Sequence, residues 1–204
     1  PNGTVGSAYP STTVQQSGGV GTIAWSISAG SLPTGLGLAP TTGAVTGTPT
    51  VGGSFGFTVR ATDGNGCFGE RAYVVSIGCQ SLSITPATLN PIPIAVSFNQ
   101  QLTLQGASGT IDWTIVAGAP PSGVTLNQTS GLLSGTPNVS GSFNFTVKAL
   151  VQSSGCFTQQ AYTLTVNCPT ITISPATLNS ANLGIPYNQQ LSQTGGAGSI
   201  IWNV

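Results

Sequence analysis

The sequence predicts an all-β protein built from repeated β-sandwich modules, and two observations carry this prediction. Apolar and polar side chains alternate with a period of two over residues 143–148 and 162–166, which is typical of half-buried antiparallel strands. The same pattern occurs earlier, at residues 55–59 and 73–77. No segment has the periodicity of an amphipathic helix, so we expect the strands to pack against other strands.

A long internal repeat sets the domain organisation. Tryptophan recurs at a nearly constant spacing, at Trp25, Trp113 and Trp202, and the motif ITPATL at residues 84–89 returns as ISPATL at 173–178. A fixed period of roughly ninety residues with turn residues throughout predicts an array of domains.

The repeat places the boundaries after Cys79 and Cys168. We expect a first module at residues 1–79 that lacks its first strand, a complete module at 80–168, and the N-terminal part of a third module at 169–204. Because both ends carry the same part of the module, the chain is expected to be an excerpt of a longer polypeptide.

The middle module supplies the predicted strand order. Turns rich in Gly, Pro, Asn and Ser separate seven expected strands, at residues 82–89 (with a break at Pro86), 98–105, 110–116, 123–127, 131–135, 142–150 and 159–167. Seven short strands with such turns are typical of a Greek-key β-sandwich of the immunoglobulin type. The chain is therefore predicted to be a head-to-tail array of immunoglobulin-like modules.

Aromatic residues on the inward strand faces form the predicted core. Trp113 lies between Ile111 and Ile115 on one face of its strand, opposite Asp112 and Thr114. Stacking on sugars is the alternative use of these rings, but their alternation favours the core. The expected core aromatic residues are Trp25, Phe57 and Tyr73 in the first module and Trp113, Phe145 and Tyr162 in the second.

The charge content excludes some functions. Charged residues make up 3% of the chain and the formal net charge is zero, so no basic face exists to neutralise nucleic-acid phosphates. No long apolar window predicts membrane insertion of this segment. Near-zero net charge favours association, which suits a surface layer, a filament or a tethered array.

The segment LPTGLGLAPTTGAVTGTPTVGGSFGFTVRATDGNGC, residues 32–67, resembles a known family of repeats. It is similar to the immunoglobulin-like repeats found in tandem in large bacterial cell-surface and secreted proteins, which are distantly similar to cadherin-like modules. The second module replaces ATDGNG with ALVQSSG, so a role for Asp63 would not carry over. The resemblance implies an extracellular, non-catalytic spacer or adhesive stalk.

Four cysteines at repeating places indicate an oxidising compartment. A strand of about ten residues separates Cys156 from Cys168 and holds its ends about 30 Å apart, whereas a disulfide needs Cα atoms within about 7 Å. In a head-to-tail array the end of one module meets the turn before the last strand of the next. We therefore expect an inter-module disulfide Cys79–Cys156.

Cys67 and Cys168 are then expected to pair with modules outside the excerpt. The alternative is local pairing, Cys67 with Cys79 and Cys156 with Cys168, if the last strands are short. Phe68 and Phe157 directly follow the loop cysteines, and we expect them to pack in the module junctions.

No catalytic or metal-binding constellation occurs in the sequence. The chain has no histidine and three carboxylates spread over two modules, so we expect no enzyme activity, no metal and no cofactor. Asp63 with Asn65 could belong to a calcium loop, but one carboxylate falls short of the oxygen ligands that calcium takes. A turn is the preferred interpretation.

These features favour a structural and adhesive repeat segment of a bacterial surface fibre, extracellular and at the cell surface. The expected partners are neighbouring modules or copies of the chain, with a surface glycan or a ligand on a host or neighbouring cell as further candidates. Two alternatives remain: a carbohydrate- or polymer-binding module of a secreted enzyme, and a filament subunit that assembles by strand exchange.

Overall fold

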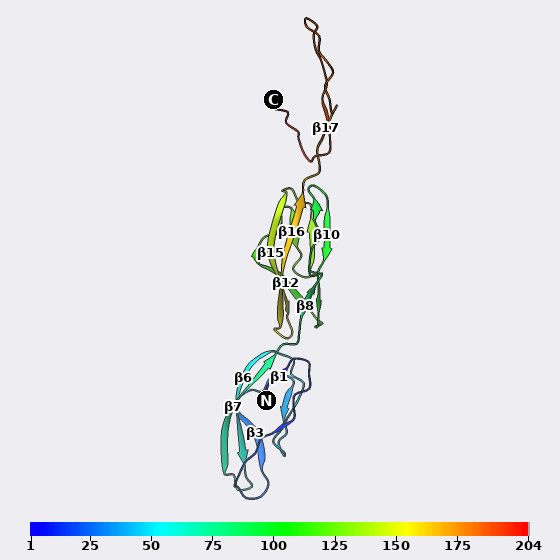
Figure 1. Ribbon diagram of the computed structural model, residues 1–204. Helices are drawn as coiled ribbons and strands as arrows, with labels where there is room; N and C mark the ends of the chain where they lie inside the picture. The colour runs from blue at the N-terminus through cyan, green and yellow to red at the C-terminus, as the bar shows by residue number, and fades with distance from the viewer. Residues whose placement is uncertain (204) are drawn as a thin grey trace.

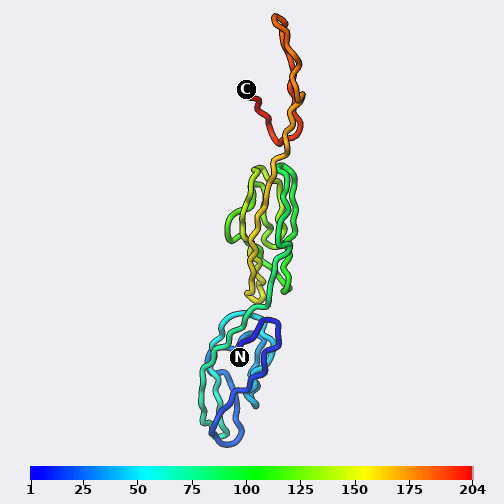
Figure 2. Tube along the Cα trace, in the orientation of Figure 1, coloured from blue at the N-terminus to red at the C-terminus, as the bar shows by residue number. Residues whose placement is uncertain are grey.

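The computed structural model describes residues 1–203 and shows two β-sandwich modules and a terminal segment arranged end to end (Figure 1). The N-terminus lies on the first module and the C-terminal segment extends beyond the second (Figure 2). No helix occurs in the described range, and so none there could span a membrane. The all-β array predicted from the sequence is the observed architecture.

The first module consists of two sheets. One has the order β1–β7–β6–β3, with β1 Gly3–Thr4, β7 Phe68–Gly78, β6 Gly53–Thr62 and β3 Ala24–Gly30. The other has the order β2–β5–β4, with β2 Thr12–Thr13, β5 Ala44–Gly47 and β4 Leu36–Leu38. Long strands β6 and β7 pair over ten residues, from Gly53 opposite Ile77 to Thr62 opposite Phe68.

The second module repeats this plan and adds one ribbon. Its larger sheet has the order β12–β15–β16–β9, with β12 Ile111–Gly118, β15 Gly141–Val151, β16 Phe157–Asn167 and β9 Ile92–Pro93. A three-stranded sheet contains β10 Phe98–Gln101, β14 Leu132–Gly135 and β13 Val124–Leu126. The added ribbon pairs β8 Ser83–Thr85 with β11 Thr103–Gln105.

Of the first predicted strand, 82–89, only residues 83–85 form a strand, β8, and a separate short strand, β9, follows at Ile92–Pro93. β8 runs antiparallel to β11, whereas β9 runs parallel to β16 in the other sheet. Pro86 ends β8 because proline has no N–H for the ladder, and the chain then crosses between the sheets. The first module contains the counterpart of β9 as β1, which pairs with β7. Among its described strands, the first module therefore lacks a counterpart of β8 but not of β9.

Each module has its own apolar core, centred on the repeated tryptophan. Trp113 is 3% exposed and Phe145 and Tyr162 pack with it. Gly131 adopts a φ of 72°, and a Cβ there would lie 2.6 Å from Trp113 Cε2. Glycine is thus required where the backbone turns over the indole ring.

The core of the first module is less completely covered. Trp25 and Phe57 are buried in it. Tyr73 is only half-buried against the cluster, with its ring centroid 5.9 Å from that of Phe57. The aromatic residues predicted for the two cores thus occupy equivalent places with unequal cover.

The terminal segment has one small ribbon. β17 Thr172–Ser174 pairs antiparallel with β18 Ser192–Thr194. Ile173 is 55% exposed, Leu183 fully exposed and Trp202 49% exposed. Residues 169–203 therefore leave most of their apolar side chains without cover.

Candidate functional site: the junction between the modules

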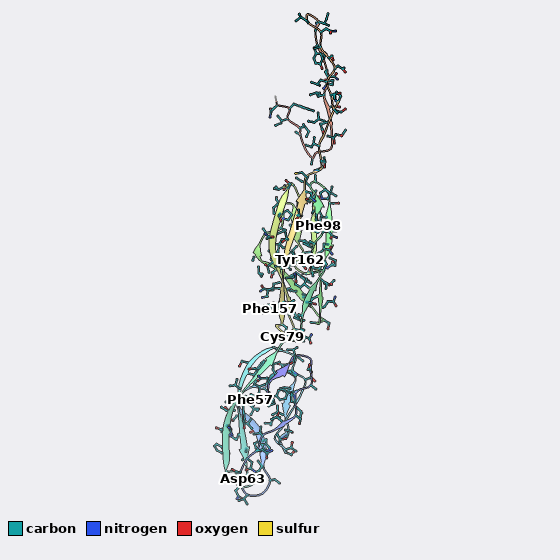
Figure 3. The ribbon with its side chains drawn as sticks, viewed as in Figure 1. Phe57, Asp63, Cys79, Phe98, Phe157 and Tyr162 are labelled. Carbon is teal, nitrogen blue, oxygen red and sulfur yellow. A yellow bond between two sulfur atoms is a disulfide. The ribbon has the colours of Figure 1, made fainter. Side chains whose placement is uncertain are left out.

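The two modules are joined covalently by a disulfide between Cys79 and Cys156. Cys79 follows β7, and Cys156 ends the turn that leads into β16. Their Cα atoms lie 5.6 Å apart and the S–S bond is 2.02 Å long. The structure therefore contains the inter-module bridge expected from the sequence, and Figure 3 shows Cys79 at the end of the first module that faces the second.

A backbone hydrogen bond fixes the turn before β16 against the first module. The amide of Gly52 donates to the carbonyl oxygen of Ser154 at 3.0 Å. The Ser154 hydroxyl in turn accepts from the Cys156 amide at 3.3 Å, and Ser154 is 6% exposed. A Cβ at Gly52 would lie 3.2 Å from Cys79 Sγ, so a side chain there would crowd the bridge.

The junction also shares apolar surface. Cys156 is 1% exposed and belongs to the core cluster of the first module together with Val5 and Ile77. Leu82, which precedes β8, packs against the same cluster. Two residues of the second module thus complete the end of the first module's core.

The linker itself is short and held from the side. Three residues, Gln80, Ser81 and Leu82, separate Cys79 from β8. The Gln80 side-chain amide donates to the carbonyl oxygen of Gly106, in the turn after β11. This hydrogen bond fixes the linker to the second module, while the disulfide joins the two modules.

Sequence reasoning finds the cysteines of this site but misses Gly52, Ser154 and Gln80. The nearest signal in the sequence is that Gly52 of the first module is replaced by Ser140 of the second, one of several differences between the repeats in this segment.

The other two cysteines, Cys67 and Cys168, are free and exposed. Cys67 precedes β7 as Cys156 precedes β16, and Cys168 follows β16 as Cys79 follows β7. The structure therefore does not contain the local pairs Cys67–Cys79 or Cys156–Cys168. The expected pairing of Cys67 and Cys168 with other modules stays a prediction.

Asp63 organises the turn between β6 and β7 at the far end of the first module (Figure 3). Its carboxylate accepts backbone N–H groups of Val20 at 3.0 Å and of Asn65 and Cys67 at 2.9 Å each. The amide of Val20, more than those of Cys67 and Asn65, holds the pKa of Asp63 below its usual value. These bonds are those of a turn residue.

Residues 1–203 contain no cluster of three or more Cys, Asp or Glu side chains arranged to hold a metal ion. Glu70 is used in an ion pair with Arg60, with Arg60 Nη2 2.8 Å from Glu70 Oε1. Hydrogen bonds from Ser28 and then Arg60 lower the pKa of Glu70.

Phe157 does not pack in the junction between the two modules, so that expectation is wrong for Phe157, whereas for Phe68, at the opposite end of the first module, it stays a prediction. Phe68 is 60% exposed with the Arg60 guanidinium 4.2 Å from its ring centroid. Phe157 is 52% exposed with Lys148 Nζ 4.5 Å from its ring centroid. Because neighbours on a strand face opposite ways, Phe157 faces outward after the buried Cys156.

Comparisons with known proteins agree with the fold. Residues 1–78 and 81–167 each match the family described as "Putative Ig domain". A comparison with curated proteins found no match.

Several solved structures are similar to this chain. Drosophila N-cadherin EC1-4 is 17% identical, with a TM-score of 0.37, covering 73% of this chain and 43% of that one. The human desmocollin-1 ectodomain is 12% identical, with a TM-score of 0.38 and coverages of 85% and 40%. An endo-fucoidan hydrolase from glycoside hydrolase family 107 is 18% identical, with a TM-score of 0.35 and coverages of 81% and 27%. The chain spans less than two thirds of the length of each.

Proposed function

Because the chain belongs to the Ig domain family through two tandem matches, we propose that it is a structural and adhesive segment of a long extracellular fibre on a bacterial surface. In this role it acts as a stiff, non-catalytic spacer. Its direct partners are the neighbouring modules and other copies of the chain.

The junction is the observation that carries this proposal. Domains joined by a linker move relative to one another unless their interface is restrained. Here a disulfide, the Gly52–Ser154 hydrogen bond and the shared packing of Cys156 restrain the same interface. A rod with such junctions transmits tension and keeps its end-to-end length.

The extracellular location is supported by the bridge, since disulfides persist in oxidising compartments and are rare in the cytosol. The non-catalytic role is supported by the inventory of reactive groups. The sequence has no histidine, and the carboxylates of Asp63 and Glu70 are engaged in a turn and an ion pair.

Module alignment in solution tests the proposal. Residual dipolar couplings would be measured for both modules in the native chain and in the Cys79→Ala/Cys156→Ala variant. We expect one shared alignment tensor in the native chain and two of different magnitude in the variant. Cys67→Ser/Cys168→Ser, which removes the free thiols, is the matched control and should keep the shared tensor. Independent alignment of the native modules would refute the stiff spacer.

Carbohydrate binding has less support than a mechanical role. Sugars stack on open aromatic faces, whereas Arg60 covers one face of Phe68 and Lys148 covers one face of Phe157. Binding of the chain to a glycan array, lost on Phe157→Ala, would reverse this preference.

A further inference from the structure

The disulfide between Cys79 and Cys156 divides the second module into two unequal parts. Strands β8 to β15 all lie within the loop that the bridge closes, which spans a sequence separation of 77. Of the strands in this module, only β16 lies outside the loop, between Cys156 and Cys168. Two covalent routes therefore lead from Cys79 to Cys156: a long one along the backbone and a short one through the two sulfur atoms.

Tension along the chain follows the short route. The Cα atoms of Cys79 and Cys156 lie 5.6 Å apart across the bridge, whereas a backbone of 77 residues extends to about 250–280 Å. The long route stays slack while the bridge is intact, because its two ends are held close together. A pull that enters at Cys79 therefore passes directly to Cys156 and continues into β16.

β16 is already extended and can lengthen very little. A strand rises about 3.3 Å per residue, and a fully extended chain reaches at most about 3.6 Å per residue. Cys156 and Cys168 are 12 positions apart in the sequence, so the length still available between them is only about 4 Å. β15 pairs with β16 over ten residues and holds it straight.

The orientation of β16 matches the direction of the pull. Phe157, its first residue, lies at the end of the second module that faces Cys79 (Figure 3), and the strand runs from there toward the terminal segment (Figure 1). Tension in β16 therefore acts along the strand. β15 lies within the slack loop and carries no tension, so the two strands are not pulled past each other.

Without the bridge, the same module would be loaded in a different way. Tension would enter through β8 and β9 and leave through β16. β9 runs parallel to β16 and pairs with it at two positions, Ile92 with Val166 and Pro93 with Asn167. Opposite pulls on two parallel strands slide one past the other. The disulfide therefore keeps the load away from the shortest strand pairing in the larger sheet.

We propose that β16 alone carries tension through the second module and that the disulfide shields residues 80–155 from it. A module loaded in this way does not unravel when the fibre is stretched, so its length and its outer surfaces are kept. This inference rests on the proposed function, which supplies the tension, and it identifies the element that resists the tension.

Stretching of single molecules tests the proposal. The whole chain, tagged at both ends, would be pulled in an optical trap. We expect one large lengthening step from the native chain, when the first module unfolds, and two from Cys79→Ala/Cys156→Ala. The variant should end about 250–280 Å longer than the native chain, whether or not its second module folds. Cys67→Ser/Cys168→Ser, the matched control, should behave as the native chain. Two large steps from the native chain would overturn the proposal.

A pair of insertions locates the route of the load. Ten Gly and Ser residues would be inserted after Val139, in an exposed turn within the shielded loop, or after Thr170, an exposed residue beyond β16. In the fully stretched native chain, the insertion after Val139 should add no length and the one after Thr170 about 35 Å. In the Cys79→Ala/Cys156→Ala background both should add about 35 Å.

Equal lengthening by the two insertions in the native background would also refute the proposal. The outcomes separate this inference from the proposed function. A native chain that lengthens in two large steps but keeps one shared alignment tensor would refute the shielding and leave the stiff spacer intact. One step with two independent tensors would refute the stiff spacer and leave the shielding intact.

Discussion

Tyr162 is a residue whose hydroxyl links the second module's last strand to the chain that crosses between its sheets. The hydroxyl donates a hydrogen bond to the carbonyl oxygen of Pro86, and Tyr162 is 3% exposed. Burial raises the pKa of Tyr162 to about 12, because the charged phenolate loses its hydration in the core. An unfolded tyrosine titrates near pH 10.

This difference predicts an alkaline loss of stability. Between about pH 10 and 12 the unfolded state releases the Tyr162 proton while the folded state retains it, so stability is full below pH 10 and falls as pH rises. We expect a loss of roughly 2–3 kcal/mol in the free energy of unfolding. Urea unfolding from pH 8 to 12, in the Cys67→Ser/Cys168→Ser background to prevent thiol exchange, measures it.

Tyr162→Phe is the control for this prediction. It removes the titrating group and keeps the ring, at a cost of about 1 kcal/mol for the lost hydrogen bond at neutral pH. The variant should show a clearly flatter alkaline slope. An unchanged slope would assign the loss to other groups.

At the scale of elements, β8 and β17 present nearly the same sequence in two environments. Ile84 is 3% exposed in the core, whereas Ile173 is 55% exposed on its ribbon. Ile84→Ala should lower the free energy of unfolding by about 2–4 kcal/mol. Ile173→Ala, the matched control, should change it by less than about 0.5 kcal/mol.

Equilibrium urea unfolding followed by tryptophan fluorescence checks both values, at protein concentrations where the chain is monomeric. Losses of about 2–4 kcal/mol for both substitutions would mean that β17 is as well packed as β8. Losses below about 0.5 kcal/mol for both would mean that β8 contributes little to the core of its module.

The elements also show what sequence can and cannot predict. The alternation in β15 and β16 is visible in the sequence because one face of β15 is half-buried or buried from Phe143 to Val151 and one face of β16 is buried from Tyr162 to Val166. The Cys79–Cys156 pairing could be reasoned out because the length of β16 separates Cys156 from Cys168. The path after Pro86 could not, because a proline marks where a strand ends but not which sheet the next strand joins.

The exposed position of Phe157 shows a second limit. Its closeness in sequence to Cys156 suggested the junction, but the direction of a side chain depends on strand register. The Gly52–Ser154 contact is harder still, because it joins two modules through backbone atoms that every residue except proline carries.

At the scale of the whole molecule, the disulfide acts on the two modules in different ways. It buries Cys156 in the core of the first module, so removing the sulfur there costs about 1–2 kcal/mol of apolar contact. The bridge spans a sequence separation of 77, and that loop contains nearly all of the second module. Closing a loop of this length reduces the entropy of the unfolded second module by the equivalent of about 4 kcal/mol.

The larger effect therefore falls on the module whose core the bridge does not enter. We expect Cys79→Ala/Cys156→Ala to lower the stability of the second module by about 4 kcal/mol and that of the first by about 1–2 kcal/mol. Amide hydrogen exchange with mass spectrometry reads the modules separately, through peptides from β6 and β7 and from β15 and β16. Cys67→Ser/Cys168→Ser should change neither set. If exchange rises more in β6 and β7 than in β15 and β16, packing at the junction outweighs loop closure, and the bridge stabilises the array mainly by completing the core of the preceding module.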